Sequence, residues 1–243
     1  MSVTQDVDAA ASIEPRWAEA PYPDYVAQVN HSIAFAGVDQ SFFTRGKARR
    51  MLDLLRRRGE DPAKIRLLDI GCGIGLIHPH IAPAFGEVVG VDVARDALDA
   101  ARGANPCVNY QCYDGRTLPT ADGAFDAVMT ICVMHHVPPT QWSAFVTDAR
   151  RVLRPGGLFM IFEHNPWNPF TRLAVARCPF DFDAALLSPS RLTRLLRDGG
   201  FGEVGREFMF FTPFALPRIA SLEERLRWCP AGAQYVAVGR KPA

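Results

Sequence analysis

Three closely spaced glycines and a neighbouring acid are the part of this sequence best suited to bind a small ligand. The stretch LLDIGCGIGL places Asp69 just before Gly71, Gly73 and Gly75. A strand that runs into a glycine turn and then a helix brings its ligand to the carboxyl edge of a parallel sheet. A dinucleotide site has the spacing G-x-G-x-x-G, whereas the spacing here is G-x-G-x-G. Because a carboxylate beside the loop repels a pyrophosphate, Asp69 suits a cation or an amino group.

A second acid extends this pattern. Asp92 ends the next predicted strand, where a carboxylate can accept hydrogen bonds from both hydroxyls of a ribose. The glycine loop carries no lysine of the kind that a phosphate-binding P-loop uses. These residues predict a nucleoside ligand whose tail is not a phosphate, and they disfavour a nicotinamide dinucleotide.

Histidines and an acid follow two later predicted strands. His135 and His136 come just after the strand at 125–132, and Glu163 and His164 end the strand at 157–164. A histidine oriented by a carboxylate can take the proton of a hydroxyl nucleophile, which accelerates a reaction by about 10²–10⁴. We expect His136 to be this base, His135 the second candidate and Glu163 the orienting acid. The alternative is that the paired histidines only cap the next helix and Glu163 only bonds backbone.

The elements that position these residues alternate between strand and helix. That order implies right-handed crossovers and a parallel sheet. Two late strands without a full crossover helix predict an antiparallel edge. The expected fold class is therefore α/β, a seven-stranded, mostly parallel sheet with an antiparallel edge and helices on both faces. Strands are predicted at 65–71, 87–94, 108–114, 125–132, 157–164, 202–211 and 233–241, and helices at 75–84, 94–103, 140–153 and 188–198.

The chain before the sheet divides into two parts. Residues 1–20 carry few large apolar side chains, and we expect a flexible N-terminus there. Residues 21–58 are predicted to form an N-terminal helical lid, and residues 59–243 the main domain. In the last lid helix an apolar stripe is expected to be buried. That stripe is Met51, Leu52, Leu54 and Leu55, while Arg49, Arg50 and Arg56 to Arg58 are expected to face water.

Four motifs, in order and correctly spaced, resemble those of class I S-adenosylmethionine-dependent methyltransferases. They are LLDIGCGIG, VVGVDVA, YDGRTLPTADGAFDAVMTICVMHHV and RVLRPGGLFMIFEH, over residues 65–165. The resemblance is to the small-molecule branch that includes quinone-biosynthesis and sugar methyltransferases. It implies S-adenosylmethionine as the cofactor and transfer of its methyl group to a small molecule, with oxygen the favoured acceptor. Transfer to carbon or nitrogen, a non-catalytic S-adenosylmethionine-binding protein and an NAD(P)-dependent oxidoreductase are the alternatives.

The resemblance also implies roles for individual residues. The methionine end of the cofactor would be held by Asp69, Gly71, Cys72, Gly73 and Gly75. Asp92 would bind the ribose, and Val93 would lie beside the adenine. The adenine amino edge would be contacted by Asp114 and Gly115, and Thr130 and Ile131 would lie along the cofactor.

Substrate recognition is expected from two segments outside these motifs. One is residues 21–47, which carries the lid aromatics Tyr22, Tyr25, Phe35, Phe42 and Phe43. The other is an insertion at about 165–187 with Trp167, Phe170, Phe180 and Phe182, and with Arg172 and Arg177. The aromatic side chains favour an apolar or ring-bearing small molecule, and the two arginines are expected to be solvated. The N-P pairs of this insertion should fix extended backbone and break helices.

Composition excludes several other classes of function. The formal net charge of +1 gives no reason to expect a nucleic-acid partner. The basic run from Arg45 to Arg58 lacks interleaved aromatics for base stacking and is expected to be a solvated helix face. Peripheral membrane contact is expected only if the substrate is lipid-borne.

The remaining composition points to the cytoplasm. No apolar run approaches the roughly 20 residues of a membrane helix, and the first 25 residues do not resemble a signal peptide. The six cysteines form no C-x-x-C pair and no Cys/His spacing of metal ligands, so we expect reduced thiols and no metal. The sequence leaves the oligomeric state open.

Overall fold

A seven-stranded sheet forms the centre of the protein. The computed structural model describes residues 25–212 and 223–243, so the expectations for residues 1–20 and for Tyr22 lie outside the described residues. The strand order is β3-β2-β1-β4-β5-β7-β6. The strands are β1 (Arg66–Ile70), β2 (Glu87–Asp92), β3 (Asn109–Cys112), β4 (Phe125–Ile131), β5 (Leu153–His164), β6 (Gly202–Met209) and β7 (Gln234–Arg240).

The direction of the strands confirms the predicted fold class. β1 to β5 pair in parallel, whereas β7 runs antiparallel to both of its neighbours, β5 and β6. The antiparallel part therefore lies at one edge of the sheet, where β7 and β6 are the last two strands.

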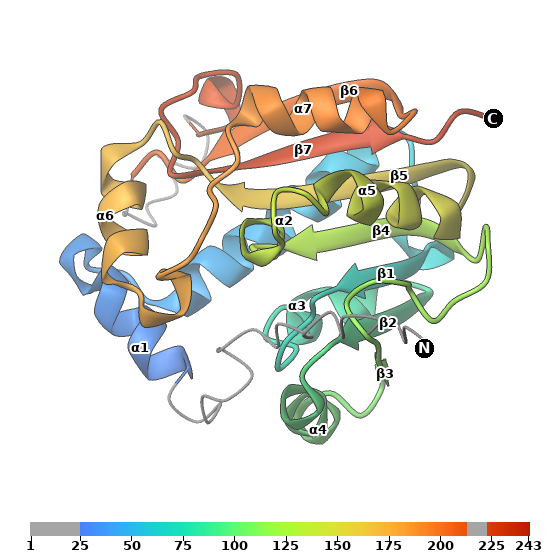
Figure 1. The fold of residues 1–243 in the computed structure, drawn as a ribbon, viewed down its shortest axis with the longest axis horizontal. Helices are drawn as coiled ribbons and strands as arrows, with labels where there is room; N and C mark the ends of the chain where they lie inside the picture. The colour runs from blue at the N-terminus through green and yellow to red at the C-terminus, as the bar shows by residue number, and fades with distance from the viewer. Residues whose placement is uncertain (1–24, 213–222) are drawn as a thin grey trace, which may run out of the picture.

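Helices cover both faces of the sheet, as predicted (Figure 1). One apolar core joins α2, α3 and α4 to one face, and a second joins α5 and α7 to the other. Successive strand residues alternate between the two cores: Leu67 packs in the first and Leu68 in the second. The helices are α1 (Tyr25–Ile33), α2 (Gln40–Arg57), α3 (His78–Ile81), α4 (Arg95–Ala104), α5 (Trp142–Val152), α6 (Pro169–Arg177) and α7 (Pro189–Asp198).

Short 3-10 turns connect several of these elements. They are η3 (Ala34–Ala36), η4 (Pro62–Lys64), η5 (Ala82–Ala84), η6 (Met134–His136) and η7 (Pro179–Asp181). The helix predicted over 75–84 is split into α3 and η5, because Pro83 has no amide hydrogen to continue the helical hydrogen bonds.

The carboxyl edge of the sheet is covered by α1 and α6 (Figure 1). The helix α6 lies in the insertion, where extended backbone was predicted. Asn168 is extended, as a residue before proline should be, and its side chain accepts the amide hydrogen of Thr171. Pro169 then occupies the first turn, where its missing amide hydrogen costs nothing, so this N-P pair starts a helix.

The basic run on α2 differs from its prediction. Arg50 is only 5% exposed and forms ion pairs with Glu207 and Glu224 at 3.3 and 3.2 Å. Lys47 is also buried. The expectation of a fully solvated basic face was therefore wrong, because acids from the C-terminal part of the chain neutralise Arg50. Among the helices of the described ranges, none has the length and apolar character to cross a bilayer.

Candidate functional site

The glycine loop after β1 takes a backbone shape that favours glycine. Gly71, Gly73 and Gly75 have φ values of +75°, +52° and +71°. The amide hydrogens of Gly71 and Cys72 are donated to the carbonyl of Val91 at 2.8 and 3.1 Å. The loop is therefore tied to the end of β2, next to the second acid of the predicted site.

The glycines face different surroundings. A Cβ on Gly71 would lie 2.4 Å from a methyl group of Val133, and one on Gly75 would lie 2.6 Å from the hydroxyl of Tyr110. A Cβ on Gly73 would meet nothing within 4 Å. The outer two glycines are thus needed for close packing, and the middle one leaves open space beside the loop where a ligand can approach the backbone.

Asp69 is held from behind by two residues that the sequence analysis did not identify. Its Oδ2 lies 3.1 Å from Nε2 of His78, and Nδ1 of His78 lies 2.5 Å from the hydroxyl of Tyr110. All three side chains are buried. The other oxygen, Oδ1, is buried and has no hydrogen-bond partner in the described part of the chain. A buried carboxylate oxygen without a partner is suited to receive an amino group.

Asp92 links the loop to the predicted ribose site. It accepts the amide hydrogens of Gly73 at 2.7 Å and Ala94 at 2.9 Å, one on each oxygen. Burial raises its pKa, and these backbone donors oppose that rise. Each carboxylate oxygen retains a lone pair, so Asp92 can still accept from hydroxyl groups.

The residues predicted to meet the adenine lie together after β2 and β3. A Cβ on Gly115 would lie 3.2 Å from a methyl group of Val93. Beside Gly115 is a small cavity lined in part by Ile70, Tyr113 and Leu118. Asp114 is exposed, and its Oδ1 accepts the amide hydrogens of Thr117 and Arg116, which lowers its pKa. One of its oxygens is therefore used within the turn.

Three further predicted cofactor residues take their places at the sheet edge. Thr130 and Ile131 end β4; Thr130 is fully buried, and its hydroxyl lacks a hydrogen-bond partner in the described ranges. The sulfur of Cys72 packs over Gly90, where a Cβ would lie 2.8 Å away. The thiol of Cys72 therefore packs against the sheet, and only its backbone is left for the predicted contact with a ligand.

The predicted catalytic residues form one cluster after β4 and β5. Glu163 is fully buried, accepts the amide hydrogen of Met134 at 2.9 Å and lies 2.6 Å from Nδ1 of His135. On the opposite side of the ring, Nε2 of His135 lies 3.4 Å from a carboxylate oxygen of Asp181. The same oxygen lies 3.5 Å from Nε2 of His136. His135 is therefore held between two carboxylates, and Asp181 bridges the two histidines.

This arrangement gives the two histidines opposite charge states. Burial opposes protonation of His135, but the charge of Glu163 and the nearby carboxylate of Asp181 raise its pKa well above the ordinary value. Burial and the charge of His135 lower the pKa of His136 to about 4. At neutral pH His135 is an imidazolium and His136 is a neutral imidazole that can accept a proton.

Glu163 orients His135 and not His136, the preferred base of the sequence analysis. The partner that the sequence analysis missed is Asp181, whose pKa His135 holds down at about 2 against the effect of burial. Asp181 lies in η7 within the insertion, and no spacing in the sequence connects it with the histidine pair. A similar absence of signal explains why His78 was missed.

The ring nitrogens of the two histidines and one Asp181 oxygen lie within 4.8 Å of one another, a separation that a divalent cation can bridge. A metal ligand must present an unprotonated nitrogen. Two flanking carboxylates favour a proton on His135, so cation and proton compete for Nε2. The expectation of a metal-free site therefore stays a prediction.

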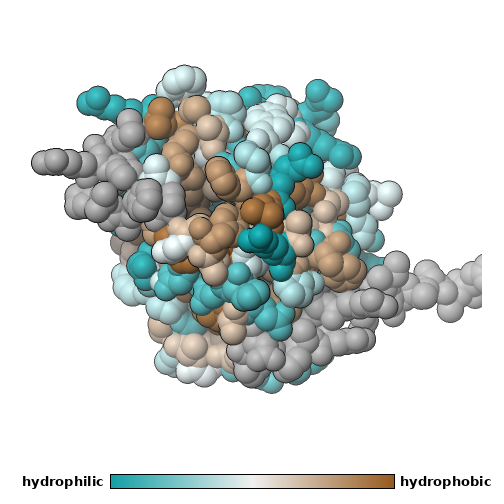
Figure 2. All heavy atoms as spheres, turned by 90° about the vertical axis from the view of Figure 1, so that its left-hand side faces the viewer, coloured by the Kyte–Doolittle hydropathy of each residue, from teal (hydrophilic) through white to brown (hydrophobic). Residues whose placement is uncertain are grey.

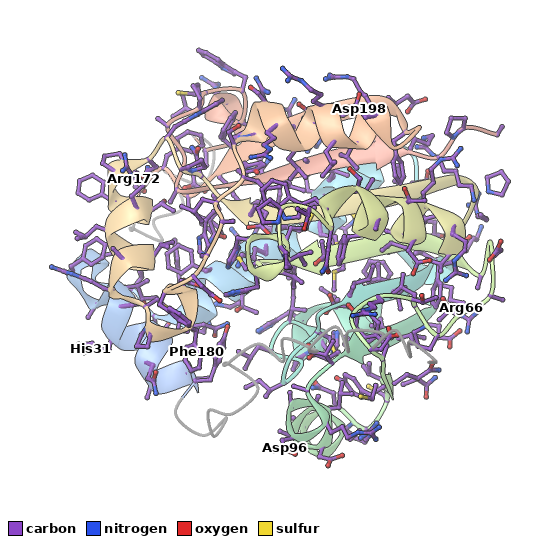
Figure 3. The ribbon with its side chains drawn as sticks, viewed as in Figure 1. His31, Arg66, Asp96, Arg172, Phe180 and Asp198 are labelled. Carbon is purple, nitrogen blue, oxygen red and sulfur yellow. The ribbon has the colours of Figure 1, made fainter. Side chains whose placement is uncertain are left out.

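The helices over the sheet edge contribute aromatic side chains to this end of the molecule. The rings of Tyr25 and Phe180 lie 5.0 Å apart and join α1 to η7. Figure 3 labels Phe180 close to α1. The guanidinium of Arg177 lies 5.5 Å from the ring of Phe35, so this arginine is stacked on an aromatic ring. Figure 2 views this end, where hydrophobic and hydrophilic side chains alternate on the surface. Its exposed apolar side chains include Trp167, Phe170, Leu173 and Phe182.

Comparison with known proteins identifies relatives of this chain. A family model described as a methyltransferase domain matches residues 68–161. An uncharacterized methyltransferase of Synechocystis is 32% identical over 140 residues, covering 56% of this chain and 66% of that protein, slightly less than two thirds of its length. A ubiquinone biosynthesis O-methyltransferase of Sinorhizobium fredii is 29% identical over 177 residues, covering 65% of this chain and 70% of that protein.

A solved structure extends the match to most of the chain. It is described as a SAM-dependent methyltransferase, possible histamine N-methyltransferase, of Thermotoga maritima. The TM-score is 0.64 at 18% identity, covering 91% of this chain and 100% of that one. At this identity the likeness concerns the fold alone.

Proposed function

Because the chain belongs to the class I S-adenosylmethionine-dependent methyltransferases, we propose that it methylates a hydroxyl oxygen on a small, ring-bearing molecule. Use of S-adenosylmethionine and methyl transfer to a small molecule follow from the family. What we propose beyond the family is that the acceptor atom is an oxygen and that the acceptor molecule carries a ring. The main observation in support of an oxygen acceptor is that His136, whose pKa is lowered, lies beside three side chains that interact in series, Asp181, His135 and Glu163.

The residues around the glycine loop fit this cofactor. S-adenosylmethionine, when bound, supplies a methyl group already activated by a sulfonium. Asp69 presents a buried oxygen without a partner to an amino group, and the open side of Gly73 admits a ligand to the backbone. Asp92 offers its remaining lone pairs to ribose hydroxyls. His78 and Tyr110 keep Asp69 in place.

The proton of the acceptor is assigned to His136. When the acceptor hydroxyl loses its proton, the imidazole of His136 would take it, and Asp181, 3.5 Å from Nε2, would stabilise the imidazolium that results. His135, already protonated and fixed by Glu163, cannot act as this base but places a positive charge near the developing alkoxide. A base whose pKa is about 4 suits an acidic hydroxyl, so a phenol is a better acceptor than an aliphatic alcohol.

One further observation supports the ring of the acceptor and another supports its oxygen. Phe180 lies in η7, the same turn as Asp181 beside His136, and its ring lies 5.0 Å from that of Tyr25 on α1. We propose that residues 21–58 and the insertion form the lid that excludes water during transfer. Several relatives are named ubiquinone biosynthesis O-methyltransferases, which supports oxygen as the acceptor atom.

The test is methyl transfer to matched acceptors. Purified protein and S-adenosylmethionine are incubated with a phenol, a catechol, the corresponding anilines and an aliphatic alcohol, and products are identified by mass spectrometry. We expect methyl ethers from the phenol and catechol. His136→Ala should lower kcat/KM on the phenol by about 10²-fold or more, with affinity for S-adenosylhomocysteine nearly unchanged.

The exposed His80 provides the matched control, because His80→Ala removes a histidine on α3, outside this cluster. Equal turnover by the His136→Ala protein would contradict the base assignment. Methylated anilines without any methyl ether would replace oxygen by nitrogen as the acceptor atom.

A further inference from the structure

Cys132 stands at the end of β4 in a position that the proposed mechanism does not use. Its backbone has φ of +55°, and its amide hydrogen is donated to the carbonyl of Phe162 at 2.8 Å. The residue is partly exposed. The next residue, Val133, packs directly against Gly71 of the glycine loop. Cys132 is therefore tied to β5 through its backbone and is one residue away from a side chain that contacts the glycine loop.

A buried ammonium group faces this thiol. Nζ of Lys47, on α2, lies 3.5 Å from Sγ of Cys132. Lys47 is only 8% exposed, and it forms no ion pair with a carboxylate within the described ranges. A buried lysine is costly unless a negative charge compensates it. An ionised Cys132 is the group in contact with Lys47 that can supply this charge.

A histidine completes the surroundings of the sulfur. The charge of the His164 imidazole favours the thiolate form of Cys132 and so lowers its pKa. On its other side, Nδ1 of His164 lies 3.4 Å from the amide nitrogen of Gln234. The buried Oε1 of Gln234 has no partner in the described part of the chain. Rotating this amide by half a turn would let Oε1 accept a hydrogen bond from the N–H at Nδ1, which matches a protonated His164 facing a thiolate.

The charges around Cys132 come from three elements. The groups that act on it are Lys47 on α2, His164 and Glu163 on β5, and His135 in η6. Burial and Glu163 oppose ionisation, but Lys47 and His164 outweigh them and lower the pKa of Cys132 to about 7. Burial acts without such partners on Cys178, raising its pKa to about 12.

We propose that Cys132, at the end of β4, is a covalent modification site for soft carbon electrophiles on the ligand-facing wall of the proposed cofactor site. The sulfur attacks the electrophilic carbon, a carbon–sulfur bond forms, and the leaving group departs with the bonding electrons. With iodoacetamide the departing group is iodide, and the thiolate has no proton to release. The location relative to the cofactor rests on the proposed function, whereas the reactivity of the sulfur does not.

The experiment measures alkylation of each cysteine against pH. Intact protein is treated briefly with iodoacetamide, digested, and the labelled fraction of Cys132 is compared with that of the exposed Cys107 in the same sample. We expect the labelling rate of Cys132 to reach half its plateau near pH 7. An ordinary thiol does so near its pKa of about 8.5. A Cys132 midpoint equal to or above that of Cys107 would overturn the proposal.

Variants test the cause of the reactivity. Lys47→Met and His164→Asn should each move the Cys132 midpoint upward by about one pH unit, the size of shift that a nearby opposite charge produces. Arg49→Met removes an exposed charge from the same helix and should leave the midpoint unchanged. If Lys47→Met leaves it unchanged as well, the assignment of the thiolate to this cluster is wrong, whatever the outcome with His164→Asn.

Protection by a ligand tests the location. Saturating S-adenosylhomocysteine should slow labelling of Cys132 and leave Cys107 unaffected. Equal labelling of Cys132 with and without bound ligand would overturn its place on the ligand-facing wall. Binding of S-adenosylhomocysteine is measured separately by calorimetry, so failure of the cofactor assignment is distinguished from failure of the proposal about Cys132.

Discussion

Replacing Glu163 by glutamine removes a negative charge from the centre of the molecule and nearly preserves the shape of the side chain. Glutamine can still accept the amide hydrogen of Met134, but its NH₂ group then faces a protonated nitrogen of His135. Two donors cannot bond each other, so His135 must lose its proton or turn away. The replacement therefore tests whether the proton on His135 is held by Glu163.

The expected loss of stability is about 2–3 kcal/mol. A hydrogen bond to a charged group contributes about 1.5–3 kcal/mol, and a fully unpaired buried charge costs about 3–5 kcal/mol. His135 can shed its proton and still donate from Nε2 toward Asp181 at 3.4 Å. The loss in free energy of unfolding should therefore stay below the cost of an unpaired charge.

The loss should depend on pH in a defined direction. The pKa of His135 is higher in the folded protein than its ordinary 6.5, so its stabilising effect is complete below pH 6.5 and disappears as pH rises through the folded value. The pKa of Glu163 is below its ordinary 4.5, so its contribution is present above pH 4.5. The free energy of unfolding lost in the Glu163→Gln protein should therefore be largest between pH 4.5 and pH 6.5 and smaller in alkaline solution.

Urea denaturation at about pH 6 and about pH 8.5 measures this difference. Glu87→Gln is a suitable control, because Glu87 pairs with Arg66 at 2.7 Å on the surface and should contribute less than about 1 kcal/mol at either pH. An equal loss for Glu163→Gln at both pH values, or a loss below about 1 kcal/mol near pH 6, would refute the charged pair.

Three further outcomes follow from the site. Asp92→Ala should weaken S-adenosylhomocysteine binding by about tenfold or more, or about 1.4 kcal/mol, by calorimetry; unchanged affinity would contradict the ribose assignment. Gly71→Ala places a Cβ 2.4 Å from Val133 at positive φ and should lower the free energy of unfolding by about 2–4 kcal/mol. Gly73→Ala has no such clash and should lower it by about 1 kcal/mol, so equal melting temperatures of the two variants would disprove this contrast. Chelation by EDTA should leave turnover unchanged if a proton occupies His135, and a loss restored by a divalent cation would show a metal there.

Much of the sheet was accessible to prediction because its signals are local. Each central strand is an apolar segment that ends in a turn, and the strands predicted at 65–71, 87–94 and 125–132 correspond to β1, β2 and β4. Leu67 and Leu68 enter opposite cores only because a strand alternates its faces. The helix α6 was not predicted, because a proline can start a helix as well as end one.

Burial of charged residues was harder to predict than secondary structure. Nothing near Arg50 in the sequence indicates that Glu207 will neutralise it, and the two residues are distant along the chain. The same holds for Lys47 and Cys132. A local charge pattern records how many charges a helix has, but not which distant element brings an opposite charge to it.

The sequence alone determined the parallel sheet, the glycine loop and the two acids beside it, because strand alternation and positive-φ turns depend on neighbouring residues. Only the tertiary structure decided which acid meets which histidine. Glu163 from β5 and Asp181 from the insertion converge on His135, leaving His136 as the neutral imidazole. Proton positions depend on distances between elements that are far apart in sequence, and folding alone sets those distances.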